Sequence, residues 1–200
     1  MNKRRYEGEQ TKINIANNAK TLFSRKGYSG TSIQDICSAA GCSKGNLYYH
    51  FKSKEELFLY LEEQASAEWL ESLEEIFSCC ETFTEKLYAY GDFASKFERP
   101  LYSAERDFIN NVGLDSEAGK KYIHILDRNY DRFQQFIAEG ITSGEIKNEG
   151  LFELTFIASS YFSALNHYSS YYCMDNETLK NLFRKATKLL LHGISTAKKG

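Results

Sequence analysis

Apolar residues recur at intervals of three and four along most of the chain, a spacing that predicts amphipathic helices. The longest run lies between about residues 53 and 77, and at 1.5 Å per residue it predicts a rod about 35 Å long. We find no two-residue alternation typical of strands and no internal repeat. The pattern therefore predicts an all-α protein with about nine helices, over residues 9–26, 31–40, 43–49, 53–77, 84–97, 101–110, 115–139, 151–174 and 176–195.

Two short helices joined by a glycine stand near the N-terminus. Thr31 precedes Gln34 by three residues, which is the spacing of a capping box at a helix start. Gly41 can take the left-handed conformation that ends helices, and Ser43 is a favourable first cap for the next helix. Helix, tight turn and short helix together predict a helix-turn-helix.

The second short helix is not built for burial, because Leu47 is its only aliphatic residue. Its other members are short, flat or cationic: Lys44, Gly45, Asn46, Tyr48, Tyr49 and His50. A helix that enters the major groove needs a slim N-terminal turn and hydrogen-bonding groups for the base edges. The composition of this helix therefore favours DNA reading.

This stretch resembles the DNA-binding signature of the TetR family of bacterial transcriptional regulators. The resemblance rests on Gly27, Tyr28, Thr31, Ile36, Ala39, Gly41, Leu47, Tyr48, Tyr49, His50, Phe51, Lys54 and Leu57. The run SKGNLYYHFKSKEELF is similar to the QacR-like, multidrug-responsive branch in particular. Cys37 and Cys42 depart from the pattern, since those positions often carry alanine or valine.

The resemblance implies a three-helix DNA-binding head, residues 1–54, on a helical ligand-binding and dimerisation body, residues 55–200. It implies a homodimer formed through the last two helices and a palindromic double-stranded DNA operator. We expect the DNA-binding residues to be Thr31, Ser32, Ser43, Lys44, Gly45, Asn46, Tyr48, Tyr49, His50 and Lys54. Within that set we assign Lys44, Gly45, Tyr48 and Tyr49 to the major groove, and Thr31, Ser32, Ser43, His50 and Lys54 to phosphates.

The charge distribution supports a head that meets DNA. The chain carries a net charge of −2, but residues 1–54 hold ten Lys and Arg against three acidic residues, a net of +7. The remainder carries −9. A basic head on an acidic body is expected when one end meets phosphate. The segment Lys3–Arg5 reads either as a mobile, solvated terminus or as an additional phosphate contact.

Aromatic residues are abundant, with 14 Tyr, 14 Phe and one Trp. They can form an ordinary core, or line a cavity for a flat or lipophilic effector. Our candidate effector residues are Trp69, Phe93, Phe97, Phe108, Asn129, Tyr130, Phe133, Phe162 and His167. The cation-binding acids of the QacR-like branch are missing, because Ala65, Ser66 and Leu126 stand at their positions, so specificity for cationic drugs does not carry over. The alternative is that nearby acids substitute for them, namely Glu98, Glu105 and Asp107.

Other chemistry finds little support in the sequence. There is no phosphate-binding glycine loop, nucleophile elbow or metal-ligand spacing, so we expect no enzyme activity, no cofactor and no metal. The five cysteines read as free thiols, with Cys79–Cys80 as a redox pair kept as an alternative. No membrane span or signal peptide is recognised, and we expect a cytoplasmic protein.

The function predicted from these features is a ligand-responsive transcriptional regulator, most simply a repressor released from its operator by a small effector. The alternative is a dimeric DNA-binding protein that responds to no ligand. The two differ in whether the purified body holds or accepts a small molecule.

Overall fold

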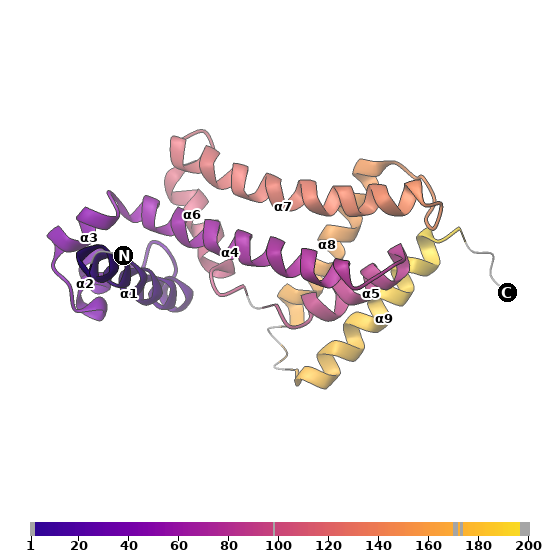
Figure 1. Cartoon of the computed structure of the whole chain (residues 1–200), viewed down its shortest axis with the longest axis horizontal. Helices are drawn as coiled ribbons and strands as arrows, with labels where there is room; N and C mark the ends of the chain where they lie inside the picture. The colour runs from indigo at the N-terminus through magenta and orange to yellow at the C-terminus, as the bar shows by residue number, and fades with distance from the viewer. Residues whose placement is uncertain (1–2, 98, 170–171, 173, 197–200) are drawn as a thin grey trace. The chain divides into compact units, whose positions relative to one another are not determined.

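The computed structural model describes residues 3–97, 99–169, 172 and 174–196, and over these residues the chain is helical (Figure 1). The helices are α1 Lys3–Lys26, α2 Ile33–Ala40, α3 Lys44–His50, α4 Lys54–Ser78, α5 Phe83–Ala94, α6 Tyr102–Val112, α7 Glu117–Thr142, α8 Leu151–Ser169 and α9 Asn176–Ile194. The described part contains one isolated bridge, between Ile146 and Ser195, outside any named strand. The prediction of an all-α protein with about nine helices is confirmed.

The chain divides into two compact units. The first comprises Met1–Ala67 with Arg99–Leu126, and the second comprises Glu68–Glu98 with Asp127–Gly200. Helices α4 and α7 each contribute residues to both units. The functional boundary at residue 54 stays a prediction, since the compact units follow different limits.

Aromatic rings dominate the core of the first unit. Phe23, Tyr28, Phe58 and Phe108 are all fully buried. The Phe58 and Phe108 rings stack at 4.5 Å, and the Tyr28 ring meets the Phe108 ring edge-on at 5.0 Å. These contacts pack α6 residues against the loop that precedes α2, so α6 belongs to the support of the helix-turn-helix.

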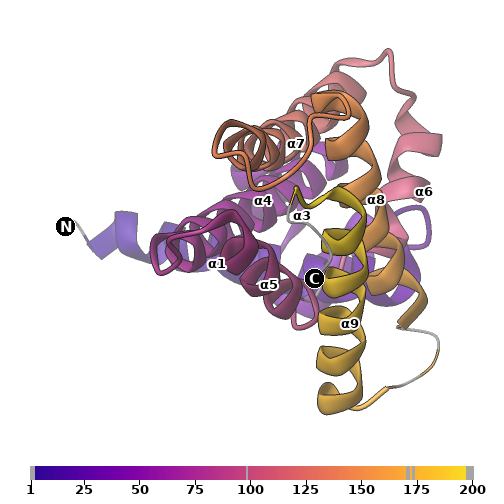
Figure 2. The same cartoon turned by 90° about the vertical axis from the view of Figure 1, so that its right-hand side faces the viewer.

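Helices α5, α8 and α9 pack together in the second unit (Figure 2). A Cβ atom added at Gly91 on α5 would lie 2.5 Å from Thr187 Oγ1 on α9. Glycine is therefore required here for close packing, because α9 fills the space beside Gly91.

The turn between α7 and α8 supplies a cap for α5. The Glu145 carboxylate accepts hydrogen bonds from the amides of Phe83 at 2.7 Å and Thr84 at 3.1 Å. Those amides are free at the start of a helix, where negative charge is favourable. A polar residue from a distant turn thus satisfies the first turn of α5.

Several helix limits differ from the sequence-based ones. Helix α1 begins at Lys3, so the Lys3–Arg5 backbone is helical; the side chains of these three residues lie outside the described part. Asn176 was predicted to cap the last helix, but α9 is capped by Asp175, whose carboxylate accepts the Thr178 amide at 2.8 Å. Helix α8 ends at Ser169, and Cys173 lies outside the described residues. Among the described helices, none is long and apolar enough to span a membrane.

Candidate nucleic-acid interface and effector site

The turn between α2 and α3 has the geometry of a Schellman helix end. Gly41 has φ = 64°, in the left-handed region that glycine tolerates best. The amides of Gly41 and Cys42 both donate to the Cys37 carbonyl, the latter at 3.0 Å. Cys37 is buried and Cys42 half-buried, so these cysteines fill the apolar contact that accompanies such a turn.

The N-terminus of α2 is capped by Ser32. Its side chain accepts the Asp35 amide, and the Asp35 carboxylate accepts the Ser32 amide, which completes a capping box. The predicted box of Thr31 with Gln34 was wrong by one residue. The bond from the Ser32 hydroxyl, helped by the Ser32 amide and by Lys26 at 3.3 Å, lowers the pKa of Asp35 to about 2.

Helix α3 is fixed by one buried residue and leaves most of its surface free. Leu47 is fully buried in the core of the first unit. The Ser43 hydroxyl caps the helix by accepting the Asn46 amide at 3.1 Å. Tyr48 is 48% exposed and Tyr49 83% exposed.

The first turn of α3 is slim as well as exposed. Lys44, Gly45 and Asn46 are all exposed. A Cβ atom added at Gly45 would have only the Ser43 Oγ within 4 Å, at 3.8 Å. Packing within the protein therefore does not require glycine at this position. His50 at the other end is half-buried, with its ring 5.0 Å from that of Tyr49.

Two of the ten predicted DNA contacts, Thr31 and Lys54, donate from their side chains to backbone carbonyls inside the protein. Thr31 is fully buried, and its hydroxyl donates to the Gly27 carbonyl at 2.9 Å. The Lys54 ammonium donates to the carbonyls of Tyr28 and Thr31, each at 3.0 Å, and lies 4.1 Å from the Tyr28 ring centroid. Burial lowers the pKa of Lys54. Both side chains shape the loop before α2.

The candidate effector residues fall into both units. Eight of the nine belong to the second unit, whereas Phe108 belongs to the first. Phe108 is fully buried and packs with Phe58 and Tyr122, at 4.5 Å and 5.7 Å between ring centroids. Phe108 thus packs in the core of the first unit, and its assignment to the effector site stays a prediction.

The Tyr90 ring contacts the rings of three candidate effector residues in the second unit. Its ring lies 5.0 Å from Phe133, 5.1 Å from Phe162 and 6.5 Å from Trp69. The spacing of Tyr90 on α5 gives no sign that its ring contacts residues of α4, α7 and α8. The four rings form a continuous aromatic cluster, which we call the Tyr90 cluster.

The other candidates carry polar groups or lie at the end of α5. The Tyr130 hydroxyl is buried and has no hydrogen-bond partner in the structure. Asn129 and His167 are half-buried and each has an interaction within the protein. Phe93 and Phe97 lie 5.0 Å apart.

The end of α5 is held by a residue that the sequence analysis did not select. Asn166 on α8 donates from its amide to the Ala94 carbonyl at 2.8 Å and to the Phe97 carbonyl at 3.4 Å. Both acceptors lie at or just beyond the end of α5, where helix carbonyls lack intrahelical partners. Asn166 thus fixes the segment that carries Phe97.

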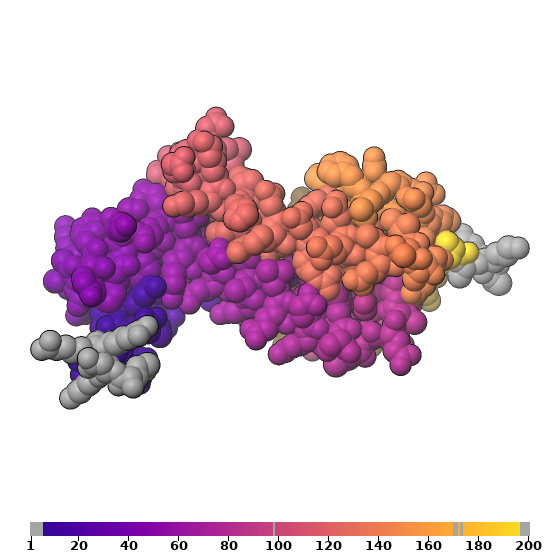
Figure 3. Space-filling model, turned by 45° about the horizontal axis from the view of Figure 1, so that its top comes forward, coloured from indigo at the N-terminus to yellow at the C-terminus, as the bar shows by residue number. Residues whose placement is uncertain are grey.

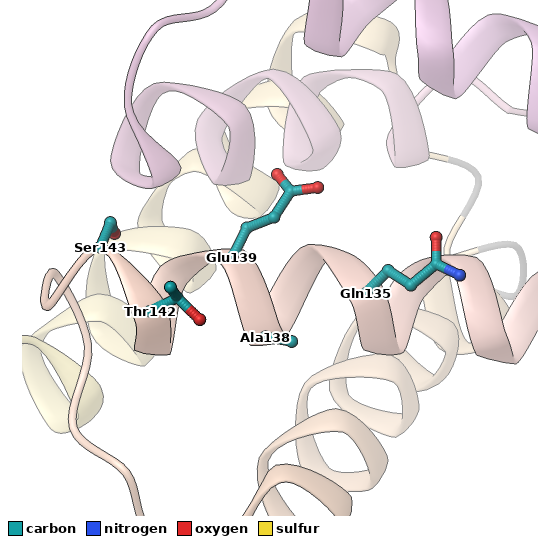
Figure 4. Close-up of a pocket in the computed structure, with 5 residues that line it drawn as sticks. All are labelled: Gln135, Ala138, Glu139, Thr142 and Ser143. Atoms are coloured by element: carbon teal, nitrogen blue, oxygen red, sulfur yellow. The ribbon is translucent and has the colours of Figure 1, made fainter.

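An open depression lies along α7, on the part of the second unit shown in Figure 4. Its lining residues are Gln135, Ala138, Glu139, Thr142 and Ser143. None is a candidate effector residue. Four of them lie on α7, whose surface is visible in Figure 3, and Ser143 directly follows that helix. This depression is open to solvent and does not enclose a ligand as a small-molecule pocket does.

The thiols of Cys42 and Cys80 are weakly reactive. Burial raises the pKa of the Cys42 thiol, with a further contribution from Cys37, and burial also raises the pKa of Cys80. Such thiols are weak nucleophiles at neutral pH. Within the described residues there is no group of three or more His, Cys, Asp or Glu placed to hold a metal ion.

Comparison with known families gives two matches that cover most of the chain. Residues 15–61 match the model for bacterial regulatory proteins of the tetR family. Residues 65–196 match the model for the C-terminal region of QacR-like proteins.

Curated relatives agree with those matches. The HTH-type transcriptional regulator QacR of Staphylococcus aureus is 28% identical over 179 residues, which span 88% of this chain and 94% of that protein. IcaR of Staphylococcus epidermidis, a negative transcriptional regulator of the biofilm operon icaADBC, is 49% identical over 47 residues, 24% of this chain and 25% of IcaR.

Solved structures share the fold. A TetR transcriptional regulator from Chloroflexus aurantiacus has a TM-score of 0.77 at 21% identity, covering 96% of this chain and all of the other. FadR from Bacillus subtilis, solved in complex with stearoyl-CoA, has a TM-score of 0.72 at 21% identity, covering 91% of this chain and 98% of FadR.

Proposed function

The chain belongs to the TetR family of bacterial regulatory proteins, with a QacR-like C-terminal region, and we propose that it is a homodimeric, cytoplasmic repressor released from a palindromic operator by a small lipophilic or aromatic effector. It is a DNA-binding transcriptional regulator, as are the curated relatives that it matches. The operator contacts, the dimer surface and the effector site are our proposals.

One observation carries the DNA-binding proposal: α3 is anchored by Leu47 alone and exposes its first turn and both tyrosines. A capped helix with a bare Gly45 can approach base edges closely. We assign base contacts to Lys44, Gly45, Tyr48 and Tyr49. Lys44 supplies donors for guanine acceptors, and the flat tyrosines supply area and hydroxyls.

Phosphate contacts follow from the exposed polar groups beside α3. We assign them to Ser32, Ser43, Asn46 and His50. We assign Thr31 and Lys54 an indirect role in DNA binding, because their hydrogen bonds hold the loop that presents Ser32. Phosphate contacts fix the register of a protein on DNA, while base contacts supply specificity.

The dimer proposal rests on an apolar surface of α8. Phe152, Phe156 and Ile157 are 62%, 56% and 58% exposed, and the two phenylalanine rings stack at 5.9 Å. On α9, Leu189 is 59% exposed. Large apolar side chains gathered on a surface mark interaction sites. A second copy of the chain, packing its α8 and α9 on these residues, would bury them and pair two heads on a palindrome.

The effector proposal rests on the Tyr90 cluster and on Tyr130. Flat rings favour a lipophilic or aromatic ligand, and an unpaired buried hydroxyl needs a partner that a ligand can supply. The effector would favour a head spacing that misses successive grooves, which lie about 34–36 Å apart. The effector can shift the equilibrium between the DNA-binding state and the released state only by the difference between its affinities for them.

The proposal is tested by gel shift of the purified protein on the DNA flanking its own gene, repeated with a panel of lipophilic and aromatic compounds. We expect a retarded band of the protein–DNA complex that disappears when some of the compounds are added. The Tyr130→Phe variant should keep the band and need more of an active compound whose polar group meets that hydroxyl. A band that no compound affects would favour the alternative, a dimeric DNA-binding protein without an effector.

A further inference from the structure

A carboxyl group lies in the core of the first unit without a full set of partners. Glu62, on the part of α4 that belongs to this unit, is only 7% exposed, and it follows Phe58 by one helical turn. Its Oε1 atom is buried and has no hydrogen-bond partner. An ionised carboxylate in such a place is strongly disfavoured.

A second carboxyl group, Glu105 on α6, acts on the first. Glu105 is well paired: both its oxygens lie 2.8 Å from Arg99 Nη2, and one accepts the Tyr122 hydroxyl at 3.0 Å. These partners stabilise the ionised form of Glu105. When two carboxyl groups share a site, the one with poorer partners keeps the proton.

The surrounding charges also favour the proton on Glu62. Burial, and next the negative charge of Glu105, raise the pKa of Glu62 to about 8. Arg99, in the segment before α6, and Lys20 on α1 act in the opposite direction and are too weak to reverse it. Burial and the same two carboxyl groups also raise the pKa of Tyr122 on α7, so its hydroxyl stays a donor to Glu105.

We propose that Glu62 is a buried proton switch: the first unit keeps its tight packing, and holds α3 ready for DNA, only while the Glu62 carboxyl carries its proton. Loss of the proton would place a second negative charge beside Glu105 in an apolar core. The carboxylate must then draw in water or leave the core, and either change loosens the packing of α4 against the helix-turn-helix. The consequence for DNA binding rests on the proposed function, whereas the effect on folding does not.

The sign of the pH dependence follows from proton linkage. In the unfolded chain Glu62 has its ordinary pKa of 4.5, and in the folded chain it holds its proton up to about pH 8. Between these values the folded state binds one more proton than the unfolded state. The Glu62 contribution to stability is therefore full below pH 4.5, falls as pH rises, and is lost by about pH 8.

The test compares the wild-type chain with Glu62→Gln, which keeps the shape and cannot ionise, and with Glu63→Gln, an exposed neighbour as control. Unfolding by denaturant is measured without DNA from pH 5 to pH 8. Relative to Glu62→Gln, the unfolding constant of the wild type should rise by up to about tenfold per pH unit. Glu63→Gln should follow the wild type.

A second readout keeps the test decisive if Glu62→Gln folds poorly. Infrared spectra of the wild type should show a protonated carboxyl band at pH 6 that disappears by pH 9 and is missing from Glu62→Met. A wild-type profile parallel to that of Glu62→Gln, or a spectrum without the band, overturns the inference.

Operator binding is measured over the same pH range. A loss of affinity in the wild type toward pH 9 that Glu62→Gln suppresses supports the switch in full. If no operator binding is found at any pH while the unfolding profiles separate as expected, the proposed function fails and the proton assignment stands. If operator affinity changes equally in both proteins, the link from Glu62 to DNA binding is wrong.

Discussion

The carboxylate of Asp107, on α6, accepts two hydrogen bonds from Ser29, in the loop between α1 and α2. The Ser29 amide donates at 2.6 Å and the Ser29 hydroxyl at 2.8 Å. These bonds hold the pKa of Asp107 below its ordinary value, the amide bond most of all. The pair ties α6 to the loop that leads into the helix-turn-helix, over 78 residues of sequence.

Asp107→Asn should lower the free energy of unfolding by about 1–2 kcal/mol at pH 7, because hydrogen bonds to a charged acceptor are replaced by weaker ones. Since the folded-state pKa is depressed, the wild type holds this contribution above the ordinary pKa of 3.8 and loses it as pH falls below that value. The difference between the proteins should therefore shrink toward pH 3. Denaturant titrations at pH 7 and pH 3 measure it.

Asp115→Asn is the matched control, since Asp115 is exposed. It should change stability by less than about 0.5 kcal/mol. Equal losses in the two variants would show that the Ser29 bonds contribute nothing specific.

Gly45→Ala should separate stability from DNA binding. The new methyl group meets only the Ser43 Oγ, at 3.8 Å, so the protein should be stabilised by up to about 1 kcal/mol through a less flexible unfolded chain. On DNA the same methyl group would hold the backbone of α3 away from the base edges. We expect operator affinity to fall at least about tenfold, measured by fluorescence anisotropy beside a thermal melt.

Gly8→Ala on α1 is the control, because a Cβ atom there meets nothing within 4 Å. It should gain stability and keep operator affinity. If Gly45→Ala binds the operator as tightly as Gly8→Ala, α3 does not approach DNA at its first turn.

The sequence identified the order and type of the helices, and the exposed character of α3, because both follow from local periodicity. The residues that cap the helices do not follow from periodicity alone. Thr31 and Ser32 are both good capping residues, and the choice between them depends on the burial of Thr31, which only the packed structure reveals. Asp175 and Asn176 pose the same problem at the start of α9.

Contacts between residues far apart in the sequence could not be read from spacing. Phe108 resembled the other aromatic candidates, yet it packs with Tyr28 and Phe58 in the first unit. Nothing in the sequence around Glu62 shows that its carboxyl group is buried near Glu105. The sequence predicted Lys54 as a phosphate contact, and its spacing gave no sign of the two carbonyl partners that the structure shows.

Lys44→Ala and Lys54→Ala remove the same charge and should give different results. Lys44 is exposed, so its removal should leave stability unchanged, weaken operator binding by about 1–3 kcal/mol, and reduce the salt slope by about 0.9 for each phosphate that is no longer neutralised. Lys54 holds two carbonyls, so its removal should cost about 1–3 kcal/mol of folding stability. Anisotropy titrations at several salt concentrations, with denaturant unfolding, test both.

If Lys44→Ala keeps both affinity and salt slope, Lys44 does not contact DNA. If Lys54→Ala is as stable as the wild type and loses only DNA affinity, Lys54 acts on phosphate directly, and its bonds to the loop contribute little.

Phe156→Arg should convert the dimer to a monomer. Phe156 is 56% exposed and stacks on Phe152, so a charge at this position would be buried without a partner if α8 packs on a second copy. A monomer reads only half of a palindrome, and its operator affinity should fall at least a hundredfold. Light scattering after gel filtration gives the mass, and circular dichroism checks the fold.

Ile123→Arg is the control for a charge placed on an exposed apolar residue. Ile123 is 36% exposed and lies on α7, in the first unit. This variant should stay dimeric and bind the operator as the wild type does. A dimeric Phe156→Arg protein would move the interface away from α8. Two monomeric variants would instead mean that assembly depends on general surface charge and not on the apolar residues of α8.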